Sequence, residues 1–192
     1  LFSIVNLFGI PFFPSKIGGV SPDLPAERAG LKKGDVILSI DGEGVMKWDE
    51  LSKIIRNSKG KDLFVKVKRN SEILEIKITP KLSPQKNLFG EEVQTFVIGI
   101  TPSDEIIVQK VGPLEAMGKG LYQTWYGIKL TVMTIVKLIE RVIPAKTIGG
   151  PILIAQLAGE QAKRGLLSLV LFMAILSINL GVINLFPIPI LD

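Results

Sequence analysis

The chain has 192 residues, of which 47% are apolar and 21% charged, and its formal net charge is +5. The charges are dispersed and no glycine-rich phosphate loop occurs, so we expect neither a nucleic acid nor a nucleotide as partner. Cysteine and histidine are both absent, which excludes disulfides, thiolate metal sites and any site in this chain that needs an imidazole.

The charged residues are unevenly distributed along the sequence. Residues 16–92 carry 27 of the 41 charged side chains, whereas residues 165–191 carry none. This split predicts a soluble domain joined to a membrane segment. The sequence opens at Leu1 inside an apolar stretch, so we expect it to be a fragment of a longer protein.

Residues 1–14 are uncharged except for the terminus, and Pro11 and Pro14 end the stretch. It is too short to cross a bilayer, which takes about 20 apolar residues. A buried strand or apolar lead-in is one interpretation. We prefer the end of a truncated transmembrane helix, because phenylalanines cluster here with glycine and proline, as they do at a membrane boundary.

Residues 15–105 predict a small mixed α/β domain. A short helix within 21–31 ends at Gly30, and an amphipathic helix over 48–57 follows. Two alternating segments joined by Asn70 and Ser71 predict a hairpin. The expected strands are 17–20, 36–40, 62–69, 72–79 and 93–100, with a loop at 81–92.

The segment SPDLPAERAGLKKGDVILSIDG, residues 21–42, resembles the PDZ family. In that family a peptide adds as a strand beside a sheet edge that follows a glycine-containing loop. The matching segment here is Val97, Ile98, Gly99 and Ile100, which follows the hairpin instead of opening the domain. The resemblance therefore implies a circularly permuted PDZ domain, a small, partly open β-barrel. An ordinary bulge or edge glycine is the alternative for Gly99.

Residues 106–165 predict a linker and amphipathic helices. In 120–142, apolar residues recur every three or four positions and form one stripe. A transmembrane helix here would bury Lys129 and Lys137, each at a cost of about 2.5–3.5 kcal/mol. We expect a helix lying in the membrane interface. The alternative is a helix packed on the soluble domain or on other membrane helices. A short helix from Pro151 to about Gly165 follows.

Residues 166–192 predict a transmembrane helix that ends in a polar motif. Asn179 and Asn184 lie within an otherwise apolar span, where a buried amide needs a hydrogen-bond partner. Pro187 and Pro189 stop the helix. Asp192 is a candidate functional residue, because an ionisable group at membrane depth is costly. The alternative is a helix that leaves the membrane and places Asp192 in water.

The motif NLGVINLFPIPILD, residues 179–192, resembles that of the site-2 family of intramembrane zinc metalloproteases, especially its bacterial sigma-E-regulating type. The resemblance implies Zn²⁺ with Asp192 as a ligand. It also implies that Asn179, Asn184, Pro187 and Pro189 bind substrate or order the active site. The histidines of the family's His-Glu-x-x-His helix are absent, so we expect no catalytic residue within this sequence and no activity from the fragment alone.

The resemblance further implies a multi-pass protein of the bacterial cytoplasmic membrane, with the PDZ domain on the extracytoplasmic side. It would cut a single-span substrate already trimmed by another protease, such as an anti-sigma factor, within the lipid bilayer, and the PDZ domain would act as a substrate filter. The alternative function is a non-catalytic, membrane-anchored PDZ adaptor. A His-Glu-x-x-His helix upstream of Leu1 would distinguish the protease from the adaptor.

Overall fold

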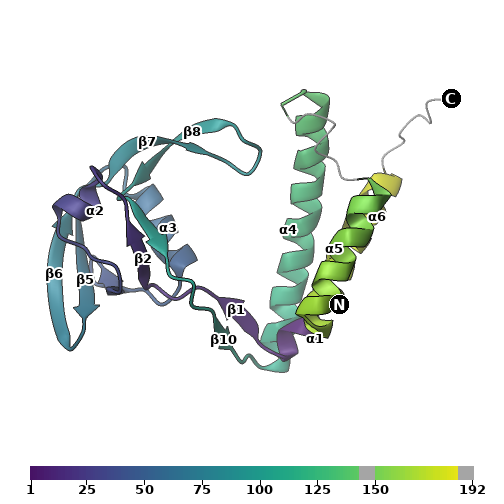
Figure 1. Ribbon diagram of the computed structural model, residues 1–192, viewed down its shortest axis with the longest axis horizontal. Coiled ribbons are helices and arrows are strands. Elements are labelled where there is room, and N and C mark those ends of the chain that lie inside the picture. The colour runs from purple at the N-terminus through teal and green to yellow at the C-terminus, as the bar shows by residue number, and fades with distance from the viewer. Residues whose placement is uncertain (143–149, 186–192) are drawn as a thin grey trace. The chain divides into compact units, whose positions relative to one another are not determined.

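The computed structural model describes residues 1–142 and 150–185, and these form two compact units (Figure 1). The mixed unit comprises residues 11–87 and 91–108. The helical unit comprises residues 1–10, 88–90 and the described chain from Gln109 onward. Strands β1 (Ile10–Phe12) and β10 (Ile107–Gln109) pair with each other where the chain enters and leaves the mixed unit.

The mixed unit contains an antiparallel four-stranded sheet with the order β4-β3-β5-β6. Strands β5 and β6 pair from Leu63↔Ile78 to Arg69↔Glu72, and Asn70, with φ of 54°, begins the turn between them. The predicted hairpin is confirmed. The strands are β3 (Val36–Ile40), β4 (Glu43–Gly44), β5 (Leu63–Arg69) and β6 (Glu72–Ile78).

Two helices and a second strand pair complete the core of the mixed unit. Strand β2 (Ile17–Val20) pairs with β9 (Ile100–Pro102), and α2 (Pro25–Arg28) is a single turn. Helix α3 (Trp48–Asn57) has the predicted bounds and buries Leu51 and Ile55, as its apolar spacing indicates. The fully buried side chains at the centre include Ile17, Ile37, Ile40, Leu51, Val65, Val67, Ile78 and Ile98.

The segment expected to be a loop, 81–92, is mostly a strand, so that prediction was wrong. Strand β7 (Lys81–Lys86) pairs with β8 (Glu92–Val97), and Asn87 and Glu91 close the turn with hydrogen bonds between their backbone and side-chain groups. Pro84 fits because, in the part of the chain that the structure describes, β7 pairs with β8 alone, so the missing N–H can lie on the unpaired edge. The predicted strand 93–100 is divided at Gly99, whose φ is +88°. The partly open barrel and the permuted order stay predictions.

The helical unit consists of α1 (Phe2–Leu7), α4 (Pro113–Ile139), α5 (Pro151–Arg164) and α6 (Leu166–Leu185). Helix α4 begins earlier than the predicted segment 120–142, with Gly112 at its N-cap and Pro113 in its first turn. Helix α5 has the predicted bounds. Within the described residues, α6 is the helix whose length and mean hydropathy of 2.5 suit a membrane span, as predicted.

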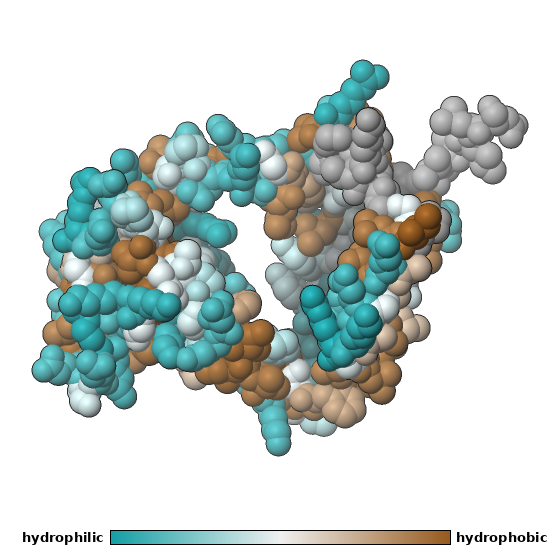
Figure 2. Space-filling model, viewed as in Figure 1, coloured by the Kyte–Doolittle hydropathy of each residue, from teal (hydrophilic) through white to brown (hydrophobic). Residues whose placement is uncertain are grey.

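Helix α4 contacts α1 and α6 through small and polar residues. A Cβ added to Gly120 would lie 2.6 Å from Ser3 N in α1, so the two backbones approach closely there. The opposite, apolar stripe of α4 is exposed among the described residues, with Leu121 at 65% and Trp125 at 67%. Figure 2 shows apolar side chains on the outside of this unit. The alternative interpretation of 120–142, packing on other helices, is therefore observed for the face of small and polar residues, and a position in the membrane interface stays a prediction.

Candidate functional site

The two asparagines of the C-terminal motif differ in their surroundings. Asn179 is partly buried and faces α4, whereas Asn184 is exposed. Five residues along a helix correspond to a rotation of about 140°, so the two amides lie on different faces of α6. Pro187, Pro189 and Asp192 lie outside the described residues.

Asn179 is linked to α4 by a hydrogen bond. Thr131 Oγ1 donates to Asn179 Oδ1 at 2.7 Å, and the same hydroxyl lies 2.9 Å from Gly127 O, one turn back in its own helix. Gly127 allows α6 to come close, because a Cβ there would lie 3.0 Å from Ile178 Cδ1. A hydrogen bond between membrane helices contributes about 0.6–2 kcal/mol. Thr131 therefore fixes the orientation of the Asn179 side chain.

A cavity of about 540 Å³ lies beside this contact, between α4 and α6. Its volume is in the range of small-ligand sites, about 300–1,000 Å³. The lining is mainly apolar, and the few polar side chains on it are Gln123, Thr131, Thr134 and Asn179. The apolar lining comes from Phe2, Tyr126, Leu130, Ile135, Leu138, Ile175, Ile178 and Ile183.

A second polar contact joins α1 to α4. Asn6 is 3% exposed, and its Nδ2 donates to Gln123 Oε1 at 3.0 Å and approaches Ala116 O at 3.4 Å. The sequence analysis did not identify Asn6, Gln123 or Thr131. Their signal is the recurrence of small and polar residues on one face of α4, at 116, 120, 123, 127, 131 and 134. In a membrane protein this is the face that contacts other helices.

The proposed peptide segment of the mixed unit has one bonded and one open side. Ile98 O accepts from Ala26 N, and Gly99 O accepts from Ser21 N, both at 2.8 Å. Within the described part of the chain, the N–H groups of Ile98 and Gly99 donate no hydrogen bond. Val97 ends β8 and Ile100 begins β9, which pairs with β2. Free, adjacent N–H groups of this kind can bind a peptide carboxylate.

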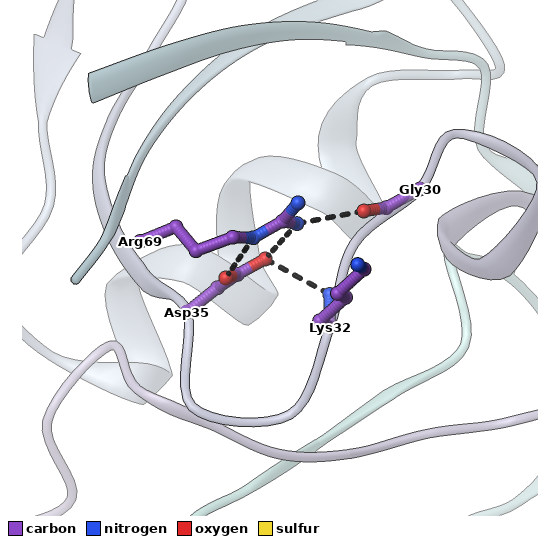
Figure 3. A network of polar contacts seen from close by, with 4 residues as sticks. All are labelled: Gly30, Lys32, Asp35 and Arg69. Carbon is purple, nitrogen blue, oxygen red and sulfur yellow. Dashed lines mark hydrogen bonds and ion pairs between the residues drawn. The ribbon is translucent and has the colours of Figure 1, made fainter. Parts of the chain in front are cut away.

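A buried ion pair holds the PDZ-like segment in place (Figure 3). Asp35 is 1% exposed and accepts from Arg69 Nε at 2.8 Å, Arg69 Nη2 at 2.7 Å and Lys32 N at 2.9 Å. Arg69 also donates to Gly30 O at 2.7 Å. Burial raises the pKa of Asp35, but the hydrogen bonds and positive charges of Arg69 and Lys32 outweigh it, so the pKa lies below 3.8. This network is structural and joins the loop 30–35 to β5.

No zinc site can be built from the described residues alone. Among them, no three histidine, cysteine, aspartate or glutamate side chains gather closely enough to bind a metal ion. The whole sequence contains neither histidine nor cysteine, so its only ionised metal donors are carboxylates. A catalytic zinc with imidazole ligands would need residues beyond this sequence, as expected above.

Comparison with known proteins adds the following. The model of peptidase family M50 matches residues 1–192. Protease RseP of Photorhabdus luminescens is 36% identical over 175 residues, 90% of this chain and 77% of that protein. Regulator of sigma-E protease RseP of Escherichia coli (strain K12) is 35% identical over 90% of this chain and 39% of its own length. A Rhizobium meliloti (strain 1021) protein, named as a candidate zinc metalloprotease, is 32% identical over 98% of this chain and 51% of its own length.

The chain thus spans about half of the Rhizobium relative and less of the Escherichia coli one. Among solved structures, the PDZ domain of an SdrC-like protein from Listeria innocua is similar. That domain has 28% sequence identity and a TM-score of 0.38, and the match covers 48% of this chain and 96% of the domain.

Proposed function

The chain belongs to peptidase family M50, and on that premise we propose that it is part of a membrane-embedded metalloprotease that cuts within transmembrane segments. The single observation that carries the proposal is the family match over residues 1–192, which includes α6 and the motif that follows it. The uncharged helix α6 would cross the bilayer and carry the motif to the reaction site.

We assign Asp192 as a zinc ligand, together with ligands outside this sequence. Bound zinc would supply Lewis-acid activation and a nucleophilic water at neutral pH. Pro187 and Pro189 would shape the segment that presents Asp192, because neither can continue a helix. Asn179 and Asn184 would contact substrate or order the site. The partly buried position of Asn179, beside an apolar cavity, supports this role.

The substrate class we propose is a single-span membrane protein that another protease has already trimmed, such as an anti-sigma factor. The mixed unit would be a permuted PDZ domain that filters such substrates. The motif at 21–42 and the unpaired N–H groups of Ile98 and Gly99 support this assignment. The protein would be a multi-pass protein of the bacterial cytoplasmic membrane, with the mixed unit on the extracytoplasmic side.

The proposal is tested with Asp192→Ala in the full-length protein, reconstituted in proteoliposomes with a single-span model substrate. We expect loss of cleavage and of bound zinc, because a carboxylate ligand is removed. Asp104→Ala, which removes an exposed carboxylate from the mixed unit, is the matched control and should leave both unchanged. Unchanged zinc content and cleavage in Asp192→Ala would refute the assignment of Asp192 as a zinc ligand. A wild-type protein that neither binds zinc nor cleaves the substrate would refute the metalloprotease assignment and favour the adaptor.

A further inference from the structure

The contact between Thr131 and Asn179 points to a role in cleavage in addition to helix packing, an inference that rests on the proposed function. Asn179 Oδ1 accepts from Thr131 Oγ1 at 2.7 Å, which occupies one half of the amide. The other half, Nδ2, carries two donors. Among the residues that the structure describes, neither of these donors has a partner. An unpaired amide on an apolar lining is free to donate to a hydrogen-bond acceptor of a ligand that enters the cavity.

The cavity between α4 and α6 is where such an acceptor could lie, because Asn179 is part of its lining. The other polar groups on the lining are engaged in part. Gln123 accepts from Asn6, and Thr134 donates to Leu130 O at 2.8 Å within its own helix. Among the described residues, Asn179 Nδ2 and Gln123 Nε2 are thus both unpartnered donors on a mainly apolar lining, and Asn179 is the one that belongs to the C-terminal motif. A ligand that fits has apolar side chains and one exposed main-chain carbonyl.

We propose that Thr131 is a positioning residue for intramembrane cleavage. By fixing Asn179 Oδ1, it holds both Nδ2 hydrogens toward the cavity, where they donate to a main-chain carbonyl of the unwound substrate segment. A transmembrane helix that unwinds for cleavage exposes carbonyl groups with no partner in lipid, so an amide donor in an apolar pocket complements them. Without the threonine hydroxyl, the amide is free to rotate about its χ2 bond.

The test uses the full-length protein in proteoliposomes with a single-span model substrate. Thr131→Val keeps the shape of the side chain and removes the hydroxyl, and we expect kcat/KM to fall about five- to thirtyfold. Thr131→Ser keeps the hydroxyl and should restore most of the activity. Thr124→Val is the matched control, because Thr124 also lies on α4 and does not line the cavity, and among the described residues its hydroxyl bonds only to Gly120 O.

A double-mutant cycle separates positioning from a purely structural role. In an Asn179→Ala background, Thr131→Val should cause no further loss, because the group it orients is gone. Thermal unfolding of each variant should match the wild type within a few degrees. Should the valine variant fail to accumulate in membranes, Thr131→Ala takes its place with the same expectation.

Two results would overturn the inference. One is cleavage by Thr131→Val within twofold of Thr124→Val, and the other is an equal loss from Thr131→Val with and without Asn179. Either result leaves the proposed protease intact as long as Asp192→Ala is inactive. Absence of cleavage and of bound zinc in the wild-type protein would instead remove the proposed function itself, so the two failures are distinguishable.

Discussion

The close approach of α1 and α4 makes Gly120 the most sharply testable position of the helical unit. A Cβ added to Gly120 would lie 2.6 Å from Ser3 N and 2.8 Å from Ser3 Cα. Both neighbours are backbone atoms, so a side-chain rotation cannot relieve the overlap. Gly120→Ala should therefore push α1 away from α4 and weaken the nearby hydrogen bond from Asn6 to Gln123.

The magnitude follows from comparison with a neighbouring glycine. A Cβ on Gly118, two residues earlier in α4, would meet nothing within 4 Å. Gly118→Ala should thus gain up to about 1 kcal/mol of helix propensity without a penalty. Gly120→Ala gains the same propensity but adds an overpacking cost of about 1–3 kcal/mol. The difference between the two alanine variants should equal the overpacking cost, with Gly120→Ala the less stable.

Denaturant unfolding of the purified full-length protein in detergent micelles measures the difference in stability. Hydrogen exchange of residues 2–8 localises it, because separation of α1 from α4 should raise exchange in that segment for Gly120→Ala only. Equal stability and equal exchange of the two variants would show that α1 does not pack on α4 at Gly120, and the described arrangement of the helical unit would be wrong.

The mixed unit yields two further predictions. Asp35→Asn should destabilise the protein by about 1.5–3 kcal/mol, because the buried Asp35 side chain loses its charge-assisted hydrogen bonds to the partly exposed Arg69, whereas Glu75→Gln, in an exposed pair, should cost less than about 1 kcal/mol. The stability contributed by Asp35 is present above its ordinary pKa of 3.8 and is lost as the pH falls through the lower folded-state pKa, so unfolding curves of wild type and variant should converge there. Gly99→Ala should weaken binding of a peptide with a free C-terminal carboxylate at least tenfold, since φ is +88° and a Cβ would lie 2.6 Å from Leu24 Cδ1. Gly42→Ala has a similar positive φ and no neighbour within 4 Å, so calorimetric titration should show unchanged affinity, and equal affinity of both variants would argue against a peptide site at Gly99.

The elements that the sequence predicts correctly are those whose stability comes from a local, repeated pattern. Helix α3 has one apolar face, and in the hairpin β5–β6 apolar and polar residues alternate on either side of a two-residue turn. Both elements therefore have the expected position. Strand β7 was missed because its alternation is weak and Pro84 suggests a loop. Its extended form depends on pairing with β8, and pairing across a long turn is not a local signal.

The candidate site shows the same division between local and non-local information. The motif at 179–192 predicts that Asn179 and Asn184 of α6 are functional, and Asn179 lies beside a cavity. The sequence does not show which residue Asn179 contacts, because Thr131 is 48 positions away on another helix. A threonine in a helix usually donates a hydrogen bond to its own backbone, as Thr124 and Thr134 do. The presence of a threonine in the sequence therefore gives no sign of a second hydrogen-bond partner.

The orientation of α4 explains why its apolar stripe alone does not predict which face of the helix packs on other helices. In a water-soluble protein, the apolar face of an amphipathic helix packs inward. Here Gly120, Gly127 and Thr131 face the other helices, while Leu121 and Trp125 are exposed among the described residues. Lipid provides no hydrophobic drive between helices, so close backbone approach and hydrogen bonds determine the contact face. The arrangement of α4 therefore supports a membrane setting for the helical unit independently of α6, and it brings Thr131 and Asn179 into contact between the two helices.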